Sequence, residues 1–217
     1  MAANISDPGS VISLSGLKAA GKDELCRRLE ASGYQTLRLS DPIRAEAVRR
    51  GLAQYTTQQL QDIGDEGRRL GGAGHWASKA LELAKERGFG KVIINGVRNP
   101  GEVEALRYAA GRRCMLVGIV APTMVRYGRA SGRGQVEDRY DLEKFLQMDD
   151  RDRGIGQPTD GQRVDACLAL VPPENIFNNE GTLEAYHAWI DALNARIEAA
   201  AARASEWQGE FGGGTGC

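Results

Sequence analysis

The stretch Gly16-Leu17-Lys18-Ala19-Ala20-Gly21-Lys22 decides how this sequence folds. It matches the pattern G-x-x-x-x-G-K, and it stands between a short apolar run at 11–15 and a segment with helical spacing at 22–32. Glycines let the backbone curl so that its N–H groups face a phosphate, and the N-terminus of the following helix adds positive charge. The pattern therefore predicts a phosphate-binding loop in which Lys22 carries charge to the phosphates.

On either side of this loop, short apolar segments alternate with segments of helical spacing. Strands are predicted at 11–15, 36–39, 91–95, 114–120 and 175–177, and helices at 22–32, 43–50, 57–70, 75–87, 102–109 and 182–204. This order favours an α/β fold with a parallel five-stranded sheet and helices on both faces. The helix at 57–70 is expected to be capped by Thr57.

The segment 123–155 has a different character, because apolar residues thin out and arginines alternate with acids. A solvated helical face is one interpretation. The position of the segment after the fourth strand favours a helical lid, from which Arg126, Arg129 or Arg133 would close over the phosphates. We expect one domain over 1–204 with this lid as an insert, followed by a flexible tail at 205–217.

Composition excludes several classes of protein. The formal net charge is -1, so there is no overall basic footprint for nucleic acid, although a local basic cleft is compatible with it. The four cysteines are scattered without a C-x-x-C pair, which predicts reduced thiols. No apolar run has the length of a membrane span, and the N-terminus lacks a secretory signal. These features predict a soluble cytoplasmic protein without a membrane partner, and they leave the oligomeric state open.

The residue after Lys22 is Asp23, where many phosphate-binding loops place the Ser or Thr that ligates magnesium. A carboxylate at this position can ligate magnesium or hold a metal-bound water. It can also be a first-turn residue favoured by the helix dipole. Both interpretations stay open.

The ending Gly21-Lys22-Asp23 is similar to that of phage-type deoxynucleoside monophosphate kinases and of animal-type phosphomevalonate kinases. Three further segments, RLSDPIR at 38–44, INGVRNPGE at 94–102 and NNEGTLE at 178–184, resemble nucleoside monophosphate kinase-like enzymes, including a group of uncharacterised archaeal P-loop kinases. The ordered set spans most of 11–190. The resemblance implies a P-loop kinase fold, ATP and Mg²⁺ as cofactors, and a nucleotide-type acceptor; a phage-encoded protein would act in the host-cell cytoplasm.

The resemblance also implies roles for individual residues. Arg44 and Arg98 match the arginines that bind the acceptor phosphate, and Gly181 would lie near the adenine of ATP. Each has a plain alternative, a surface ion pair for the arginines and a strand-to-helix turn for the glycine. Asn95 stands where relatives have an Asp that orients magnesium through water, and Asp23 is hypothesised to compensate for the lost charge.

Asp41 separates the possible acceptors. An acceptor phosphate needs no general base, and Asp41 would then orient Arg44 or contact the sugar. An alcohol acceptor would make Asp41 the candidate catalytic base. An Asx-Pro turn or a helix cap is the structural alternative.

Four functions follow from these patterns. The leading one is a nucleoside or deoxynucleoside monophosphate kinase. The second is a kinase for 5-hydroxymethyluracil in DNA, and its strand-binding candidates are Arg49, Arg50, Arg68, Arg69, Arg112 and Arg113. The others are a small-molecule kinase of the phosphomevalonate type and a non-catalytic ATP-binding module.

Overall fold

The computed structural model describes residues 7–132 and 141–211, without the side chains of 57 and of 201–211. One sheet contains five parallel strands in the order β2-β3-β1-β4-β5. The strands are β1 (Ser10–Ser15), β2 (Gln35–Arg38), β3 (Lys91–Val97), β4 (Cys114–Val120) and β5 (Ile176–Asn178). Because all strands run the same way, their carboxyl ends meet at one edge, where α/β proteins place their ligands.

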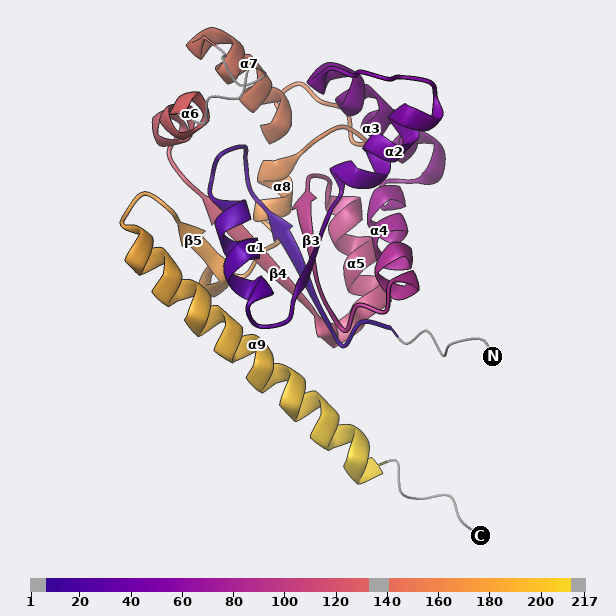
Figure 1. The fold of residues 1–217 in the computed structure, drawn as a ribbon, viewed down its shortest axis with the longest axis vertical. Helices are drawn as coiled ribbons and strands as arrows, with labels where there is room; N and C mark the ends of the chain where they lie inside the picture. Colours follow the sequence, from indigo (N-terminus) through magenta and orange to yellow (C-terminus); the bar gives the residue numbers. More distant parts are fainter. Residues whose placement is uncertain (1–6, 133–140, 212–217) are drawn as a thin grey trace.

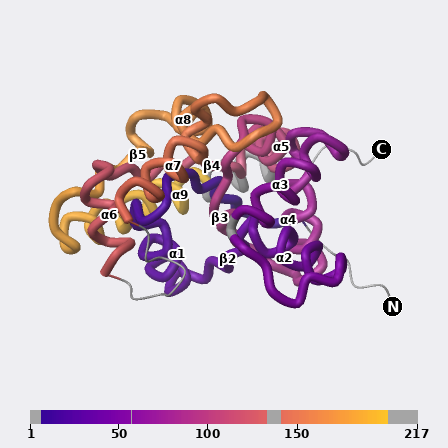
Figure 2. Tube along the Cα trace, turned by 90° about the horizontal axis from the view of Figure 1, so that it is seen from above, coloured from indigo at the N-terminus to yellow at the C-terminus, as the bar shows by residue number. Residues whose placement is uncertain are grey.

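Helices cover both faces of the sheet (Figures 1 and 2). They are α1 (Lys22–Glu30), α2 (Ser40–Arg49), α3 (Thr57–Gly71), α4 (His75–Glu86), α5 (Pro100–Ala110), α6 (Thr123–Gly132), α7 (Leu142–Arg153), α8 (Val164–Leu168) and α9 (Leu183–Phe211), with the short 3₁₀ helices η1 (Gly111–Arg113) and η3 (Pro173–Asn175). The predicted α/β fold class is confirmed. In the described part of the chain, no helix is long and apolar enough to cross a membrane.

The apolar run of β1 is buried on both faces, as its sequence predicts for the centre of a parallel sheet. Ile12 and Leu14 pack in a core that includes Leu25 of α1 and Ile190 of α9. Val11 faces the opposite core, formed with α4 and α5. Figure 1 shows α1 and α9 on one face and α4 and α5 on the other. This packing holds the phosphate-binding loop rigidly at the end of β1.

Helices α6 and α7 lie over the phosphate-binding loop, in the segment predicted as a lid (Figure 1). Ala19 of the loop packs with Ala130 of α6 and Phe145 of α7. Arg126 of α6 is only 1% exposed and forms an ion pair with Asp149 of α7, with Nη2 2.7 Å from Oδ2. A charge that is buried and paired in this way joins two helices, so Arg126 is not available as a lid arginine.

Several element boundaries differ from those predicted. Helix α2 begins at Ser40, because a proline is tolerated in the first turn of a helix. Helix α3 is capped by Thr56, whose Oγ1 accepts a hydrogen bond from the backbone N of Gln59 at 3.2 Å, so the prediction of Thr57 as the cap is wrong. Helix α9 continues to Phe211. The predicted flexible tail stays a prediction, and 212–217 lie outside the described residues.

Replacing Asp149 by alanine should destabilise the protein strongly, because it leaves the guanidinium of Arg126 buried without a counter-charge. We expect the free energy of unfolding in urea to fall by about 3–5 kcal/mol. The matched control is Asp150→Ala, because Asp150 is an exposed neighbour on the same helix. A loss below about 1 kcal/mol for Asp149→Ala would show that this ion pair does not anchor α6 to α7.

Candidate functional site

The phosphate-binding loop has backbone that only glycine fits at two positions. Gly16 has a φ of 151°, and a Cβ there would lie 2.3 Å from the carbonyl O of Ile119. Gly21 has a φ of 113°, and its Cβ would lie 2.2 Å from Nδ2 of Asn179. Both φ values belong to a region that residues with a side chain rarely adopt. The two glycines of the motif are therefore required by strand β4 and by the connection that leads into α9.

The connection between β5 and α9, together with the start of α9, also holds the phosphate-binding loop through two side chains. Asn179 donates from Nδ2 to the carbonyl O of Ala20 at 2.8 Å, and the hydroxyl of Tyr186 donates to the carbonyl O of Gly21 at 3.0 Å. Both side chains are buried. The carbonyls of Ala20 and Gly21 therefore accept hydrogen bonds from side chains outside the loop. These contacts fix the end of the loop where α1 begins. Asn179 and Tyr186 were not predicted as site residues, since their roles depend on contacts across the whole chain.

Lys22 is half-buried, and its ammonium is held by the loop itself. Its Nζ donates to the carbonyl O of Gly16 at 2.7 Å and of Leu17 at 2.9 Å. Burial lowers the pKa of Lys22 to about 8, and the positive charge of Arg98 adds to the effect. Lys22 is therefore a cation that gains strongly from a nearby anion.

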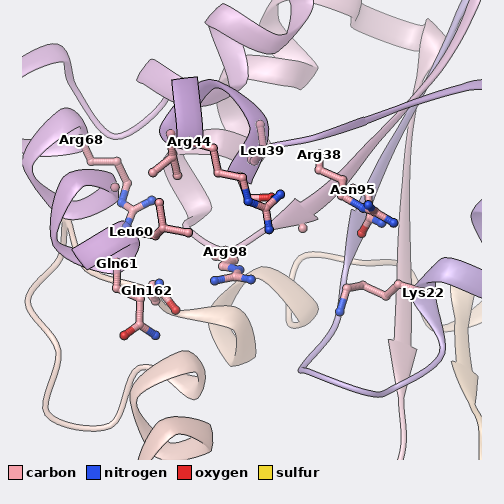
Figure 3. Close-up of a pocket in the computed structure, with 14 residues that line it drawn as sticks. Lys22, Arg38, Leu39, Arg44, Leu60, Gln61, Arg68, Asn95, Arg98 and Gln162 are labelled. Atoms are coloured by element: carbon pink, nitrogen blue, oxygen red, sulfur yellow. The ribbon is translucent and has the colours of Figure 1, made fainter. Parts of the chain in front are cut away.

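A cavity of about 240 Å³ opens beside Lys22, at the carboxyl ends of β2 and β3 (Figure 3). It contains five cationic side chains and no carboxylate among its lining residues. The lining is formed by Lys22, Arg38, Leu39, Ser40, Ile43, Arg44, Leu60, Gln61, Gly64, Arg68, Asn95, Gly96, Arg98 and Gln162. The predicted acceptor arginines Arg44 and Arg98 are thus brought together with the predicted phosphate lysine. The charge of the lining is suited to an anionic ligand.

Arg44 and Arg98 are partly exposed, at 44% and 42% of their side chains. Arg44 donates from Nη1 to Oγ of Ser40 at 3.0 Å and to Oδ1 of Asp41 at 3.2 Å. The guanidinium of Arg98 lies 4.0 Å from Oδ1 of Asp152. Neither arginine is buried in a short ion pair, so both guanidinium groups can turn toward a ligand.

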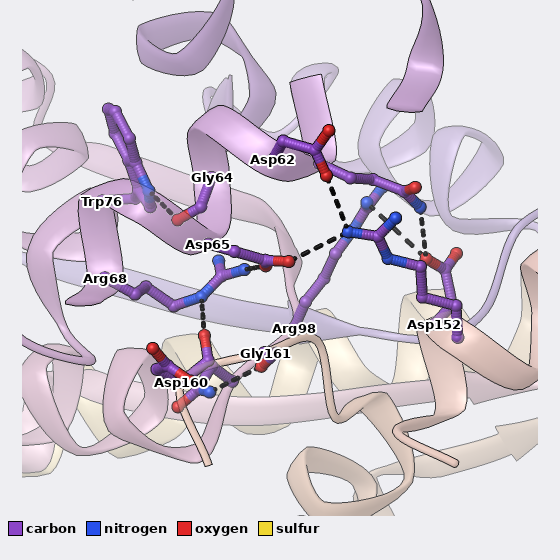
Figure 4. Close-up of polar contacts among 12 residues, drawn as sticks. Asp62, Gly64, Asp65, Arg68, Trp76, Arg98, Asp152, Asp160 and Gly161 are labelled. Atoms are coloured by element: carbon purple, nitrogen blue, oxygen red, sulfur yellow. Dashed lines mark hydrogen bonds and ion pairs between the residues drawn. The ribbon is translucent and has the colours of Figure 1, made fainter. Parts of the chain in front are cut away.

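Arg68 is held much more firmly. It is 3% exposed and donates from Nη1 to Glu102 at 3.0 Å and from Nε to the carbonyl O of Asp160 at 2.6 Å; it also pairs with Asp65 (Figure 4). Its charge is balanced by these carboxylates, and its pair with Glu102 joins α3 to α5. Arg68 therefore serves as a fixed part of the cavity wall. The sequence named Arg68 only as a DNA-binding candidate and did not predict its place in the cavity wall, because Arg68 and Glu102 are far apart along the chain.

Asp23 and Asn95 lie next to one another at the loop, with Asn95 Nδ2 3.5 Å from Asp23 Oδ1. The same oxygen accepts from Nη2 of Arg38 at 3.2 Å. One carboxylate and one amide fit magnesium, which usually binds few protein oxygens and fills its remaining positions with phosphate and water. The two residues that the sequence singled out for a metal are therefore neighbours, and the ligand role of each stays a prediction.

Asp41 does not line the cavity. Its side chain is exposed and lies in a separate surface groove with Asp23. Besides its contact with Arg44, it accepts a hydrogen bond from the backbone N of Arg38 at 3.2 Å. This arrangement suits the role of orienting Arg44 better than the role of a base, although either stays a prediction.

Of the lid arginines, Arg129 contacts the connection between β5 and α9. Its Nη2 donates to the carbonyl O of Asn179 at 2.9 Å, while its Nη1 is buried without a hydrogen-bond partner. A buried donor without a partner is costly, and a phosphate or base could satisfy it. Gly181 lies in the same connection between β5 and α9, and its predicted contact with adenine is untested. Arg133 lies outside the described residues.

The arginine pairs considered for DNA binding are not gathered in one groove. Arg49 and Arg50 of α2 pair with Glu46, and Arg68 is buried. Arg113 donates to the carbonyl O of Pro8 at 2.8 Å, at the amino end of β4 and away from the phosphate-binding loop. This distribution gives no support to a strand-binding groove made of these residues.

Comparisons with known proteins place the chain among archaeal relatives. A UPF0200 protein from Methanosarcina mazei is 30% identical over 190 residues, covering 87% of this chain and 96% of that protein. UPF0200 protein PAE1629 from Pyrobaculum aerophilum is 36% identical over 148 residues, covering 68% and 79%. The crystal structure of TT1252 from Thermus thermophilus has a TM-score of 0.50 at 16% identity, covering 89% of this chain and 98% of that one, which concerns the fold alone. No protein-family model matches.

The lowered pKa of Lys22 predicts how the binding of an anionic phosphate ligand, with ATP as the probe, would depend on pH. Without ligand Lys22 is charged below about pH 8 and neutral above it. Phosphate oxygens favour the charged form of Lys22, so its pKa is higher in the complex than in the free protein. At a pH between these two pKa values, binding is accompanied by uptake of a proton. We expect affinity to fall above about pH 8, by up to about tenfold per pH unit.

Calorimetry between about pH 7.5 and 9.5, in buffers of different ionisation enthalpy, measures both the affinity and the proton uptake. The variant Lys22→Met should bind ATP weakly and without this slope. An affinity of the unmodified protein that is constant over the range would contradict the prediction.

Proposed function

We propose that this chain, which belongs to the UPF0200 family, is an ATP-dependent kinase whose acceptor already carries a phosphate, in the first place a nucleoside or deoxynucleoside monophosphate. The observation that carries the proposal is the cavity beside Lys22, with five cationic side chains and no carboxylate in its lining.

In this proposal the protein acts mainly by positioning and by offsetting charge, as phosphoryl transfer requires. The amides of the loop and the N-terminus of α1 would hold the phosphates of ATP. Lys22 would exchange its two carbonyl contacts for phosphate oxygens, which are stronger partners because they are charged. Asp23 and Asn95 would hold magnesium, which when bound offsets negative charge on the phosphates.

On the acceptor side, Arg44 and Arg98 would hold the acceptor phosphate in line with the γ-phosphate. An acceptor phosphate is ionised at neutral pH, so no general base is needed, and Asp41 would orient Arg44 through their 3.2 Å contact. Arg129 would offset charge from the other side. The packing of α6 and α7 against the loop would exclude water and so limit hydrolysis of ATP.

The direct test is transfer of label from γ-labelled ATP to a panel of acceptors in the presence of Mg²⁺. The panel contains ribo- and deoxynucleoside monophosphates, phosphomevalonate, and DNA with and without 5-hydroxymethyluracil. We expect label on a nucleoside monophosphate, and we expect Lys22→Ala to reduce the rate on the order of 10²–10³-fold.

Each other outcome changes the proposal in a defined way. Label on phosphomevalonate alone would support an acceptor that carries a phosphate, but it would show that this acceptor is not a nucleotide. Label on DNA alone would overturn the proposed acceptor and make Asp41 the candidate base. Tight ATP binding without transfer to any acceptor would indicate a non-catalytic module.

Arg44→Ala and Arg98→Ala should each raise the KM for the acceptor by about 10–100-fold, because each removes a charged hydrogen bond to its phosphate. The KM for ATP should change little. The control is Arg112→Ala, an exposed arginine in η1 outside the cavity. Steady-state kinetics with each substrate varied separately makes the comparison; equal changes in both KM values would place these arginines outside the acceptor site.

A further inference from the structure

The end of the cavity away from Lys22 differs in chemistry from the end beside it. Figure 3 shows Gln61 and Gln162 together there, near Leu60 and Arg68, while Arg44 and Arg98 lie between this end and Lys22. Gln61 is 6% exposed and Gln162 is 3% exposed. The cavity therefore has a cationic end next to the phosphate-binding loop and an end with two buried side-chain amides.

Gln162 carries an unpartnered polar atom. Its Oε1 is buried and has no hydrogen-bond partner. A buried acceptor left unpaired costs about 1–3 kcal/mol, which a ligand with a suitable donor would recover. The last side-chain torsion of glutamine has a broad energy profile, so this amide can rotate at low cost to meet a donor.

The backbone around Gln162 is fixed by hydrogen bonds to three distant residues, one of which is the acceptor-side Arg98. Arg68 Nε donates to the carbonyl O of Asp160 at 2.6 Å, and Asn99 Nδ2 donates to that of Gly161 at 2.8 Å (Figure 4). The backbone N of Arg163 donates to the carbonyl O of Arg98 at 2.6 Å. These contacts lie on both sides of Gln162, so its backbone stands at a set place relative to Arg98. A side chain placed in this way is suited to selecting a ligand.

The adjacent Gln61 donates from Nε2 toward Oδ1 of Asp152 at 3.5 Å, which ties the same end of the cavity to α7. Side-chain amides present an acceptor and donors in one plane, and the edges of nucleobases present the complementary pattern. Leu39, Ile43 and Leu60 supply apolar lining to the same cavity. This combination matches a molecule with a phosphate at one end and a nitrogen heterocycle at the other.

We infer that Gln162 determines acceptor specificity, by accepting a hydrogen bond from an N–H of the nucleobase while Arg44 and Arg98 hold the phosphate. The inference rests on the proposed function, because it describes the same acceptor site. The inference goes beyond the proposed function because it names the group that is recognised, an N–H of the nucleobase. It also names the residue that recognises it, Gln162 in the segment after α7.

The first test compares equilibrium binding of AMP, GMP, UMP, CMP and dTMP to the unmodified protein and to Gln162→Leu. The monophosphate that binds most tightly should lose about 10–100-fold in affinity, because the variant cannot accept its hydrogen bond. Affinity for ATP should not change. The matched control is Gln157→Leu, since Gln157 lies in the same segment and outside the cavity lining. An unchanged affinity in Gln162→Leu would overturn the inference.

The second test needs no stable variant, and it uses monophosphates whose base has lost a donor. The pairs are UMP with 3-methyl-UMP, GMP with 1-methyl-GMP, and AMP with N6,N6-dimethyl-AMP. For the preferred base, methylation should weaken binding to the unmodified protein by a similar factor. In Gln162→Leu the same methylation should have little effect, because the paired group is already gone. Equal binding of the two members of each pair by the unmodified protein would contradict the inference even if the variant did not fold.

The results separate this inference from the proposed function. Phosphate transfer to a monophosphate with no effect of Gln162→Leu would retain the proposed function and overturn the inference. Binding of a monophosphate that depends on Gln162, without transfer from ATP, would do the reverse. Absence of binding for all five monophosphates would overturn both.

Discussion

The backbone at Gly16 passes so close to the carbonyl O of Ile119 that a single added carbon would lie 2.3 Å from it, and the arrangement of the site depends on this contact. It requires β4 to lie beside β1, as the sheet order provides. Gly21 imposes the same constraint toward Asn179, which brings the start of α9 against the loop. The loop is therefore shaped by three separate parts of the chain, and its amides are held in place before any ligand arrives.

The charges around the loop are balanced unequally, and this imbalance points to the ligand. Arg68 is buried among carboxylates and has a structural role, as has Arg126 in its pair with Asp149. Lys22, by contrast, is hydrogen-bonded only to carbonyls in the contacts described, and burial lowers its pKa. Arg44 and Arg98 are exposed and loosely paired. The cations that can move toward a ligand thus lie on one side of the cavity, where an anion would replace their weak contacts.

The sequence predicted the parts of this site that follow from local patterns. The loop motif located Lys22, and the resemblance to nucleoside monophosphate kinase-like enzymes located Arg44 and Arg98. Thr56 and Thr57 were indistinguishable in sequence, and the extended backbone at Thr56 decides between them. Gln162 could not be predicted, because its place depends on hydrogen bonds donated by Arg68 and Asn99 and on one accepted by the carbonyl O of Arg98, and these residues come from distant segments. Long-range contacts of this kind leave no periodicity or spacing in the sequence.

The central claim is that this cavity binds the phosphate of an acceptor. The most direct test is the affinity of the unmodified protein for one nucleoside monophosphate and for the same nucleoside without its phosphate, measured by calorimetry in the same buffer. Two charged hydrogen bonds from arginine predict a preference for the monophosphate of at least on the order of a hundredfold, weakened by added salt. Equal affinity for the two, or tighter binding of the nucleoside, would contradict the claim.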